Sequence, residues 1–252
     1  MEQPVRERIH LIDEIRGFSI IMMVIYHAAY DIVVIFNVNF PLFYHPVIRF
    51  LEPLFAGLFI FVSGMSGRLS RSNLKRGAIC FGLGMLITLV TYLAMPEELI
   101  VFGILHLLGI SMMLFALLRP VLDRIPVPVG FAVFFALGLL TLGVPYGYIG
   151  IKGIFSAALP ASLYATSYLF PLGFIGSGFH SADYFSLIPW FFFFLSGSYA
   201  GIPLKERKFP KVFYNLHSSF FAATGKHTLI IYLLHQPILY GLLSLVFALV
   251  PR

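Results

Sequence analysis

The chain has 252 residues, of which 59% are hydrophobic and only 11% are charged, and its mean hydropathy is +0.92. Soluble domains average about 25% charged and 45–50% apolar residues, so the composition excludes a soluble globular protein and indicates an integral membrane protein. The net charge of +6 is better interpreted as an orientation signal than as a nucleic-acid-binding surface. The single cysteine, Cys80, excludes a disulfide framework, a cysteine-rich zinc site and a CxxC redox pair.

Seven apolar runs are long enough to cross a bilayer, which needs about 20 helical residues. The first run is interpreted as a retained helix, because it continues through His27 and Asp31 and no A-x-A cleavage site follows. The sequence therefore predicts an all-α, polytopic helical bundle that forms a single domain over residues 1–252. The predicted spans are residues 15–36, 47–64, 77–94, 99–118, 127–144, 184–202 and 228–250.

An eighth candidate, residues 153–179, carries no charge but is rich in Gly, Ser, Pro and Tyr, so it is either a further crossing or a re-entrant or surface-lying segment. With seven spans and a cytoplasmic N-terminus, 14 of the 17 Lys and Arg residues lie on the cytoplasmic side. An eighth crossing would leave only 10 there. The positive-inside rule therefore favours seven spans, with the C-terminus outside.

One polar stripe follows the first predicted helix. His27 and Asp31 are four residues apart and so lie on one face, and Arg16 lies on the same face toward the cytoplasm. His27 is 11 residues from Arg16, about 16 Å along the axis at 1.5 Å per residue, which places it near the membrane midplane. Because a carboxylate one turn from an imidazole raises its basicity, the pair is typical of a general base.

Two further embedded histidines, His106 and His235, are candidates for contact with a substrate, and Pro237 interrupts the helical hydrogen bonds beside His235. The alternative for each histidine is a hydrogen bond to a neighbouring helix. The histidines lack tight ligand spacing, so we expect no metal. A retinal-type receptor would need a lysine in the middle of the membrane, whereas the last span has only Lys226 at its inner entrance.

The cytoplasmic exit of the second span combines small residues, hydroxyls and cations, from Ser63 through Arg68 and Arg71. Small residues let a ligand approach the backbone and cations suit phosphates, so a phosphate-bearing donor is predicted to bind here. Positive-inside bias alone would also account for the cations. On the outer side, Asp183 precedes the sixth span and is either its N-cap or a contact for the acceptor.

Several segments in order along the chain resemble the catalytic domain of heparan-α-glucosaminide N-acetyltransferase in its compact prokaryotic form, within the transmembrane acyltransferases. They are IHLIDEIRGF at 9–18, MMVIYH at 22–27, FIFVSG at 59–64, FGILHLLG at 102–109, DYFSLIPW at 183–190 and GKHTLIIYLLHQP at 225–237. The resemblance implies that an acetyl group passes from cytosolic acetyl-CoA to an amine or hydroxyl of an acceptor, a small molecule or glycan, on the outer side. The chain is much shorter than the lysosomal enzyme and has fewer spans.

By position, the resemblance makes His27 the catalytic histidine and Asp31 its orienting partner. It places Arg16, Ser63, Arg68 and Arg71 near CoA. The transfer is either direct, with His27 as the base, or proceeds through an acetylated imidazole. The implied setting is the lipid bilayer of a prokaryotic cytoplasmic membrane, without nucleic acid, and a homodimer is one option for assembly. The rival function is a small proton-coupled transporter, because embedded His/Asp pairs also relay protons.

Overall fold

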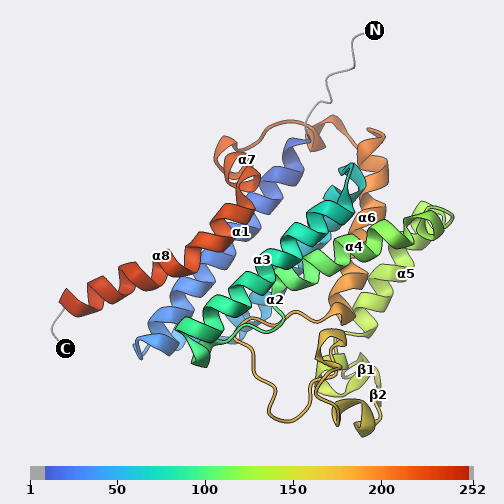
Figure 1. Cartoon of the computed structure of the whole chain (residues 1–252). Coiled ribbons are helices and arrows are strands. Elements are labelled where there is room, and N and C mark those ends of the chain that lie inside the picture. Colours follow the sequence, from blue (N-terminus) through green and yellow to red (C-terminus); the bar gives the residue numbers. More distant parts are fainter. Residues whose placement is uncertain (1–8, 250–252) are drawn as a thin grey trace. The chain divides into compact units, whose positions relative to one another are not determined.

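A computed structural model describes residues 9–249 of the chain (Figure 1). These residues are predominantly helical. Seven helices are long and apolar enough to cross a membrane, as predicted. The helices are α1 (His10–Tyr30), α2 (Pro46–Leu69), α3 (Asn73–Ala94), α4 (Ile104–Leu122), α5 (Val127–Leu140), α6 (Leu187–Lys205), α7 (Ser219–Lys226) and α8 (Thr228–Leu249). Among the helices of residues 9–249, α5 reaches spanning length together with the turn that ends at Tyr146. The eight-residue α7 is too short to span and is absent from the sequence prediction.

The chain divides into two compact units. Unit 1 contains the described residues up to Val62 together with those from Phe209 onward, so it holds α1, most of α2, α7 and α8. Unit 2 is Ser63–Lys208 and holds the end of α2 together with α3, α4, α5 and α6.

Unit 1 is built on a close contact between α1 and α7. A Cβ atom added to Gly225 would lie 1.7 Å from the carbonyl oxygen of Asp13, and one added to Gly17 would lie 2.0 Å from that of Phe221. Only glycine allows the two backbones to approach this closely. Phe18 packs edge-on against Phe221 beside the contact, with ring centroids 5.8 Å apart. The contact fixes the N-terminal half of α1 against the segment that leads into α8.

The end of α1 changes its winding at Asp31. Residues Asp31–Ile35 form a π-helical turn, in which the backbone N–H of Phe36 donates to the carbonyl of Asp31 at 2.9 Å. Such turns occur often at functional positions in helices. The Phe36 ring stacks on Phe247 of α8 with centroids 4.7 Å apart, so the turn is packed against the far part of α8.

Unit 2 consists of the helix pairs α3/α4 and α5/α6, joined to the end of α2. Gly109 of α4 faces the backbone of Phe81 in α3, and Gly130 of α5 lies under the ring of Tyr199 in α6. Gly64 of α2 approaches α6 so closely that an added Cβ would lie 1.9 Å from the carbonyl oxygen of Phe194. Small residues in this unit therefore let helices pack at short range, as is typical of membrane bundles.

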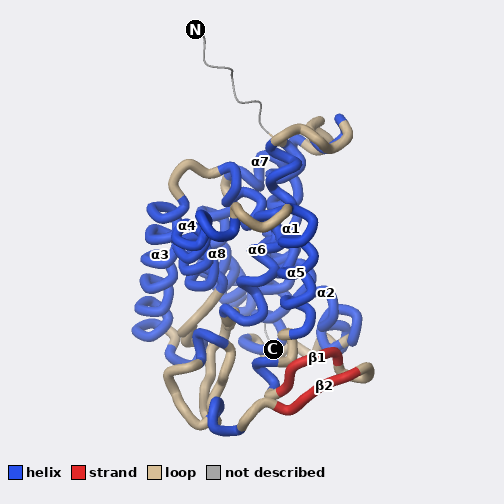
Figure 2. The backbone as a smooth tube through the Cα atoms, turned by 90° about the vertical axis from the view of Figure 1, so that its right-hand side faces the viewer, coloured by secondary structure: helices blue, strands red, loops and turns tan. Residues whose placement is uncertain are grey.

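The segment between α5 and α6 contains no spanning helix. It begins with a two-stranded antiparallel hairpin, β1 (Tyr148–Ile151) and β2 (Phe155–Ala158), and continues through short 3₁₀ turns at Ala161–Tyr164 and Phe170–Leu172. Figure 2 shows the two strands, in red, beyond the end of α5. The eighth crossing considered for residues 153–179 is therefore wrong, and the seven-span alternative holds.

Candidate active site

The polar stripe of α1 meets α8 inside unit 1. Asp31 is fully buried, and its Oδ1 accepts a hydrogen bond of 2.6 Å from Nε2 of Gln236. Gln236 belongs to the HQP motif of α8, and its role is visible only in the tertiary structure. Its other amide atom, Oε1, is also buried. The structure thus adds Gln236 to the candidate site as the residue that holds the Asp31 carboxyl group.

His27 lies against His235 of α8. The two imidazole centroids are 5.1 Å apart with an interplanar angle of 61°, and the Tyr26 ring lies on another side at 5.9 Å. The contacts that the described residues make with the His27 ring are these ring contacts; a hydrogen bond to Asp31 is not among them. The structure therefore brings His235, a candidate for contact with the substrate, beside His27, whereas Asp31 accepts a hydrogen bond from Gln236.

The position of one proton in this cluster follows from geometry. Nδ1 of His235 lies 2.7 Å from the carbonyl oxygen of Tyr232, and because a carbonyl only accepts, this nitrogen carries the hydrogen. In the neutral form of His235, Nε2 is then the basic nitrogen. The cluster brings two imidazoles and a buried carboxyl group together within the membrane, which is a chemical set suited to proton transfer.

Arg16 lies on the N-terminal side of the same stripe. Its Nη2 donates to the hydroxyl of Thr228 at 2.7 Å, and its Nη1 lies 3.9 Å from Oδ1 of Asp13. The side chain keeps 22% of its surface exposed, and Lys226 nearby in sequence is also exposed. Arg16 therefore joins the start of α8 to α1 while still presenting charge at the surface.

Glu14 is a buried acid that the sequence analysis left without a role. Its Oε1 accepts hydrogen bonds from the backbone N–H groups of His217 at 2.7 Å and Ser218 at 3.2 Å, and its Oε2 lies 3.1 Å from Nδ1 of His217. Ser218 is the N-cap of α7 and accepts from the N–H of Phe221. The carboxylate thus fixes the start of α7 on α1, and only the tertiary structure reveals this partner.

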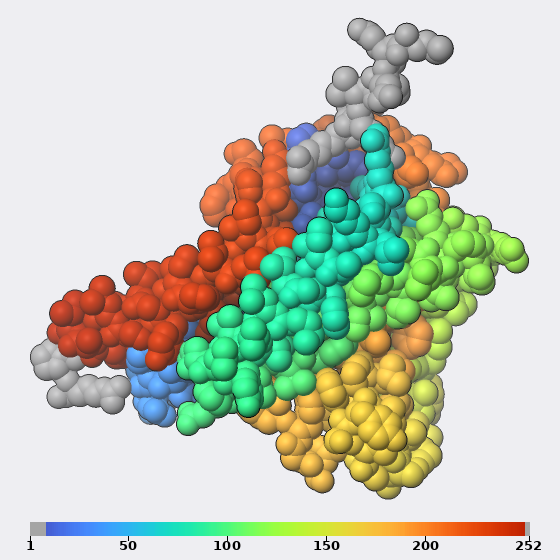
Figure 3. All heavy atoms as spheres, viewed as in Figure 1, coloured from blue at the N-terminus to red at the C-terminus, as the bar shows by residue number. Residues whose placement is uncertain are grey.

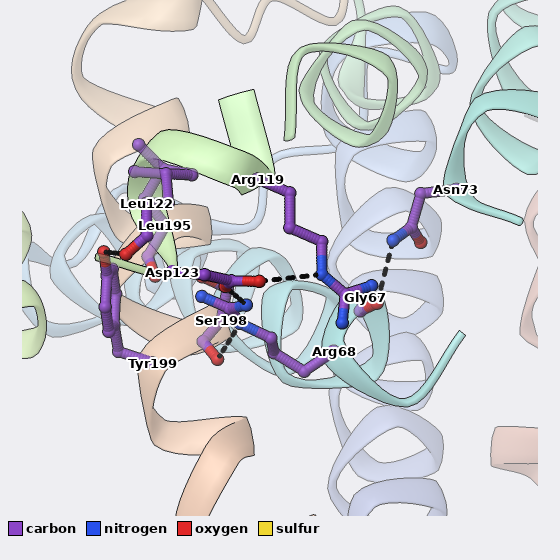
Figure 4. A network of polar contacts seen from close by, with 9 residues as sticks. All are labelled: Gly67, Arg68, Asn73, Arg119, Leu122, Asp123, Leu195, Ser198 and Tyr199. Carbon is purple, nitrogen blue, oxygen red and sulfur yellow. Dashed lines mark hydrogen bonds and ion pairs between the residues drawn. The ribbon is translucent and has the colours of Figure 1, made fainter. Parts of the chain in front are cut away.

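In unit 2, Arg68 is buried and takes part in a network of polar contacts (Figure 4). It is 5% exposed, its Nε donates to the carbonyl of Ser198 at 3.2 Å, and its Nη1 forms an ion pair with Asp123. The guanidinium also lies 5.0 Å from the ring centre of Phe115 and 5.4 Å from that of Tyr199. This geometry favours a structural role for Arg68 over the predicted contact with CoA phosphates.

Asp123 completes this network just beyond the end of α4. Its second oxygen lies 3.3 Å from Nε of Arg119. Partial burial alone would raise the pKa of Asp123, but the hydrogen bonds and charges of Arg68 and Arg119 outweigh it and hold the pKa below its ordinary value. The carboxylate is therefore the charge that Arg68 needs in its buried position.

The remaining predicted donor contacts differ from Arg68 in exposure. Arg71 is exposed in the loop between α2 and α3, and Ser63 is partly buried in α2. The neighbouring Gly64 faces the backbone of α6, so its small size is accounted for by helix packing. Arg71 is thus the predicted cation of this cluster that is placed to reach a solvent-borne phosphate.

His106 and Asp183 act at the beginning of α4. Nδ1 of His106 accepts from the N–H of Gly103 at 3.2 Å, so its Nε2 carries the hydrogen and faces the Thr88 hydroxyl at 3.3 Å. Asp183 accepts from the N–H of Ile104 at 3.0 Å and so caps α4. The expectation that Asp183 caps the sixth span is wrong, since Ser186 is the N-cap of α6.

Both ring nitrogens of His106 are engaged by the protein, and the residue is 2% exposed. Its geometry therefore matches the alternative of a histidine bonded to a neighbouring helix. Within residues 9–249, no group of three or more His, Cys, Asp or Glu side chains is arranged to hold a metal ion.

A family model described as heparan-alpha-glucosaminide N-acetyltransferase, catalytic, matches residues 8–237, which is most of the chain. The match confirms the resemblance found in the sequence motifs. No curated protein and no solved structure is significantly similar to the chain.

Proposed function

Since this chain belongs to the family of heparan-α-glucosaminide N-acetyltransferase catalytic domains, we propose that it transfers an acetyl group from cytosolic acetyl-CoA to an amine or hydroxyl of a sugar acceptor on the outer side of the membrane. The family and the seven membrane helices make it a transmembrane acetyltransferase. The observation that supports the finer proposal is the pairing of His27 with His235 beside the buried Asp31, inside helices that cross the membrane.

His27 is the general base of the proposed reaction. The acceptor nitrogen or oxygen attacks the thioester carbonyl while His27 takes its proton; the C–S bond breaks, and the departing CoA thiolate receives the proton from the imidazolium. General-base catalysis of this kind contributes about 10²–10⁴-fold to a rate. Because the His235 ring lies beside that of His27, an acceptor that reaches His27 also meets His235.

Asp31 and Gln236 support the base through charge and position. One turn separates Asp31 from His27 on the same helix, so an ionised Asp31 stabilises the imidazolium that forms during transfer. The hydrogen bond from Gln236 keeps the Asp31 carboxyl group in place. This differs from the direct orienting bond implied by the resemblance, because Asp31 acts on His27 by electrostatics.

The donor enters from the basic, cytoplasmic end of the helices. Arg16 of unit 1 is partly exposed and Arg71 of unit 2 is exposed, and an accessible cation suits the phosphates of CoA. Along α1, Arg16 and His27 are separated by about 16 Å at 1.5 Å per residue. The pantetheine arm of CoA is thin and uncharged, so it can carry the thioester inward while the nucleotide stays outside the hydrocarbon.

Binding of the donor is tested by the thermal unfolding of the purified protein with CoA, acetyl-CoA and pantetheine. A ligand present at 100 times its Kd stabilises a protein by about 2.7 kcal/mol, so CoA and acetyl-CoA should raise the melting temperature. Pantetheine is the matched control, because it lacks the phosphates and should give a smaller shift. If neither CoA nor acetyl-CoA changes the melting temperature, the proton-coupled transporter becomes the better hypothesis.

The proposed orientation is tested by labelling cysteines in intact cells with a reagent that cannot cross the membrane. Lys208→Cys, in the loop after α6, should stay unlabelled from outside, whereas Lys152→Cys in the β1–β2 turn should react. Both lysines are exposed, and the native Cys80 is buried, so the comparison reports topology. Labelling at position 208 but not at 152 would reverse the orientation and reject delivery to the outer side.

A further inference from the structure

One face of the β1–β2 hairpin is entirely apolar and exposed. The strands pair Ile149 with Ala157 and Ile151 with Phe155, and residues directly opposite in a hairpin point to the same side. Ile149 and Ile151 are 39% and 38% exposed and Phe155 is 58% exposed. Ile154, in the turn between the strands, is 77% exposed. Exposure of such an apolar face to water is unfavourable, so we expect it to contact another apolar surface.

Tyr148, on the opposite face of the hairpin, attaches the hairpin to the segment that follows α5. Its ring packs over Gly143, where an added Cβ would come within 2.2 Å of it. Tyr164 also donates from its hydroxyl to the carbonyl of Val144 at 2.5 Å, next to the start of the hairpin. The contacts of Tyr148 and Tyr164 therefore fix the direction in which the apolar face points.

The hairpin directly follows a candidate membrane span that also exposes apolar side chains. The hairpin follows α5 after one short turn, Val144–Tyr146, and Leu139 and Leu142 on that span are 37% and 42% exposed. In Figure 3 the atoms of this region, in yellow, lie at the surface at one end of unit 2. Tyr146 and Tyr168 are 79% and 72% exposed nearby in the chain, and tyrosine is enriched where helices leave the hydrocarbon.

We propose that the β1–β2 hairpin lies in the boundary between headgroups and acyl chains of the leaflet at this end of the helices. Its apolar face contacts the acyl chains, and Lys152 in the turn contacts lipid phosphates. The outer edges of a two-stranded sheet keep backbone N–H and C=O groups that need water or headgroups, so the hairpin stays at the interface and does not enter the hydrocarbon core.

Tryptophan fluorescence in lipid vesicles tests this placement. The chain has one tryptophan, so Trp190→Phe gives a silent background that keeps an aromatic ring beside Phe185 and Phe193. Ile154→Trp and, separately, Phe155→Trp then place a single probe on the hairpin. Leu139→Trp is the matched control on a membrane span. Each variant is measured in phosphatidylcholine brominated near the headgroup or deep in the acyl chain, and with iodide in solution.

For both hairpin probes we expect quenching by shallow bromine to exceed quenching by deep bromine, with little quenching by iodide. Quenching by iodide alone would show a hairpin in water and overturn the proposal. Protection from all three quenchers would show a protein partner, such as a second copy of the chain, and would overturn it as well. Stronger quenching by deep bromine would contradict the interfacial depth. Two probes at adjacent positions guard against a single poorly folded variant.

Discussion

His27 and His106 are two histidines in membrane helices whose surroundings differ. His106 uses both ring nitrogens at the start of α4, toward Gly103 and Thr88, and is 2% exposed. His27 instead faces the imidazole of His235, next to the buried Asp31. A histidine with both nitrogens bonded by the protein stabilises a helix end, whereas one that faces a second imidazole is placed to exchange a proton.

Arg68 and Arg71 show the same contrast between a side chain bound by the protein and one exposed to solvent. Arg68 is enclosed by Asp123, the carbonyl of Ser198 and two aromatic rings, whereas Arg71, three residues later, is exposed. A buried charge with its partners supplied by the protein is part of the packing. An exposed charge at the same membrane edge remains available to a ligand. Contacts, rather than residue type, therefore distinguish the polar groups that the protein itself binds from those that we propose to be functional.

The largest effect that we expect comes from His27→Ala. Removing the proposed general base should lower the rate of acetyl transfer by about 10²–10⁴-fold. The melting temperature and its increase with CoA should stay close to those of the unchanged protein, because the ring contacts of His27 are with Tyr26 and His235 only among the described residues. Acetyl transfer from radiolabelled acetyl-CoA measures the first quantity and thermal unfolding the second.

His106→Ala is the matched comparison for His27→Ala. It deletes two hydrogen bonds at the start of α4 and leaves Gly103 N–H without its acceptor, at a cost of about 1–3 kcal/mol. We therefore expect a clear fall in melting temperature for this variant. A His27→Ala protein that transfers acetyl at the normal rate would remove His27 from the mechanism, and one that unfolds would give it the structural role assigned to His106.

The second effect concerns Arg68 and Arg71. Arg68→Ala removes hydrogen bonds to a carboxylate and a carbonyl, so it should reduce the free energy of unfolding by about 1.5–3 kcal/mol. Arg71→Ala should change stability by less than about 0.5 kcal/mol, as is usual for exposed positions. It should, however, reduce the stabilisation by CoA. Equal loss of stability in both variants would contradict the difference between the two arginines.

The sequence predicted the membrane helices well because hydrophobic length is a local property. The predicted fifth span, residues 127–144, begins at the first residue of α5. The spanning segment in the structure ends at Tyr146, two residues beyond the predicted end. The first helix starts at His10 rather than at residue 15, since Glu14 is buried through its bonds to His217 and Ser218. In the sequence, the charge of Glu14 marks the end of the apolar run. In the structure, hydrogen bonds from the distant residues His217 and Ser218 offset the cost of burying that charge.

The candidate site was predicted only where its geometry lies within one helix. The spacing of His27 and Asp31 follows from helical periodicity, whereas the bond from Gln236 to Asp31 joins residues 205 positions apart. The sequence offers Asp183 as the N-cap of the following helix or as a contact for the acceptor, yet its carboxylate accepts from Ile104 of α4, 79 positions earlier. α7 is an eight-residue helix whose packing against α1 depends on Gly225 meeting the backbone of Asp13, which hydropathy does not reveal.

A smaller effect is expected for Asp31→Asn, which keeps the shape of the side chain and removes its charge. Acetyl transfer should fall by about tenfold, equivalent to about 1.4 kcal/mol, and so by less than for His27→Ala. The acid limb of the pH–rate profile should move to lower pH, because the His27 imidazolium loses its counter-charge. Gln236→Leu should shift the profile in the same direction by a smaller amount. Loss of rate without any shift would show that Asp31 acts only through structure.

The smallest effect is the pH dependence contributed by Asp123. Arg68 and Arg119 overcome the effect of burial and lower the pKa of this carboxyl group in the folded protein. Because its pKa is lowered, the ionised Asp123 contributes to stability at pH values above the pKa of an aspartate in the unfolded chain, about 3.9. This contribution is lost as the pH falls through the pKa of Asp123 in the folded protein.

Asp123→Asn should therefore melt at a lower temperature than the unchanged protein at pH 7, and the difference should shrink as the pH is lowered below about 4, where an aspartate in the unfolded chain takes up its proton. The difference should be modest, because the Asp123 side chain is 45% exposed and solvent screens its charge. Melting curves of both proteins between neutral and acid pH measure it. A difference that stays constant over this range would mean that Asp123 stabilises Arg68 by shape alone, and the contrast with the exposed Arg71 would then rest on packing rather than on charge.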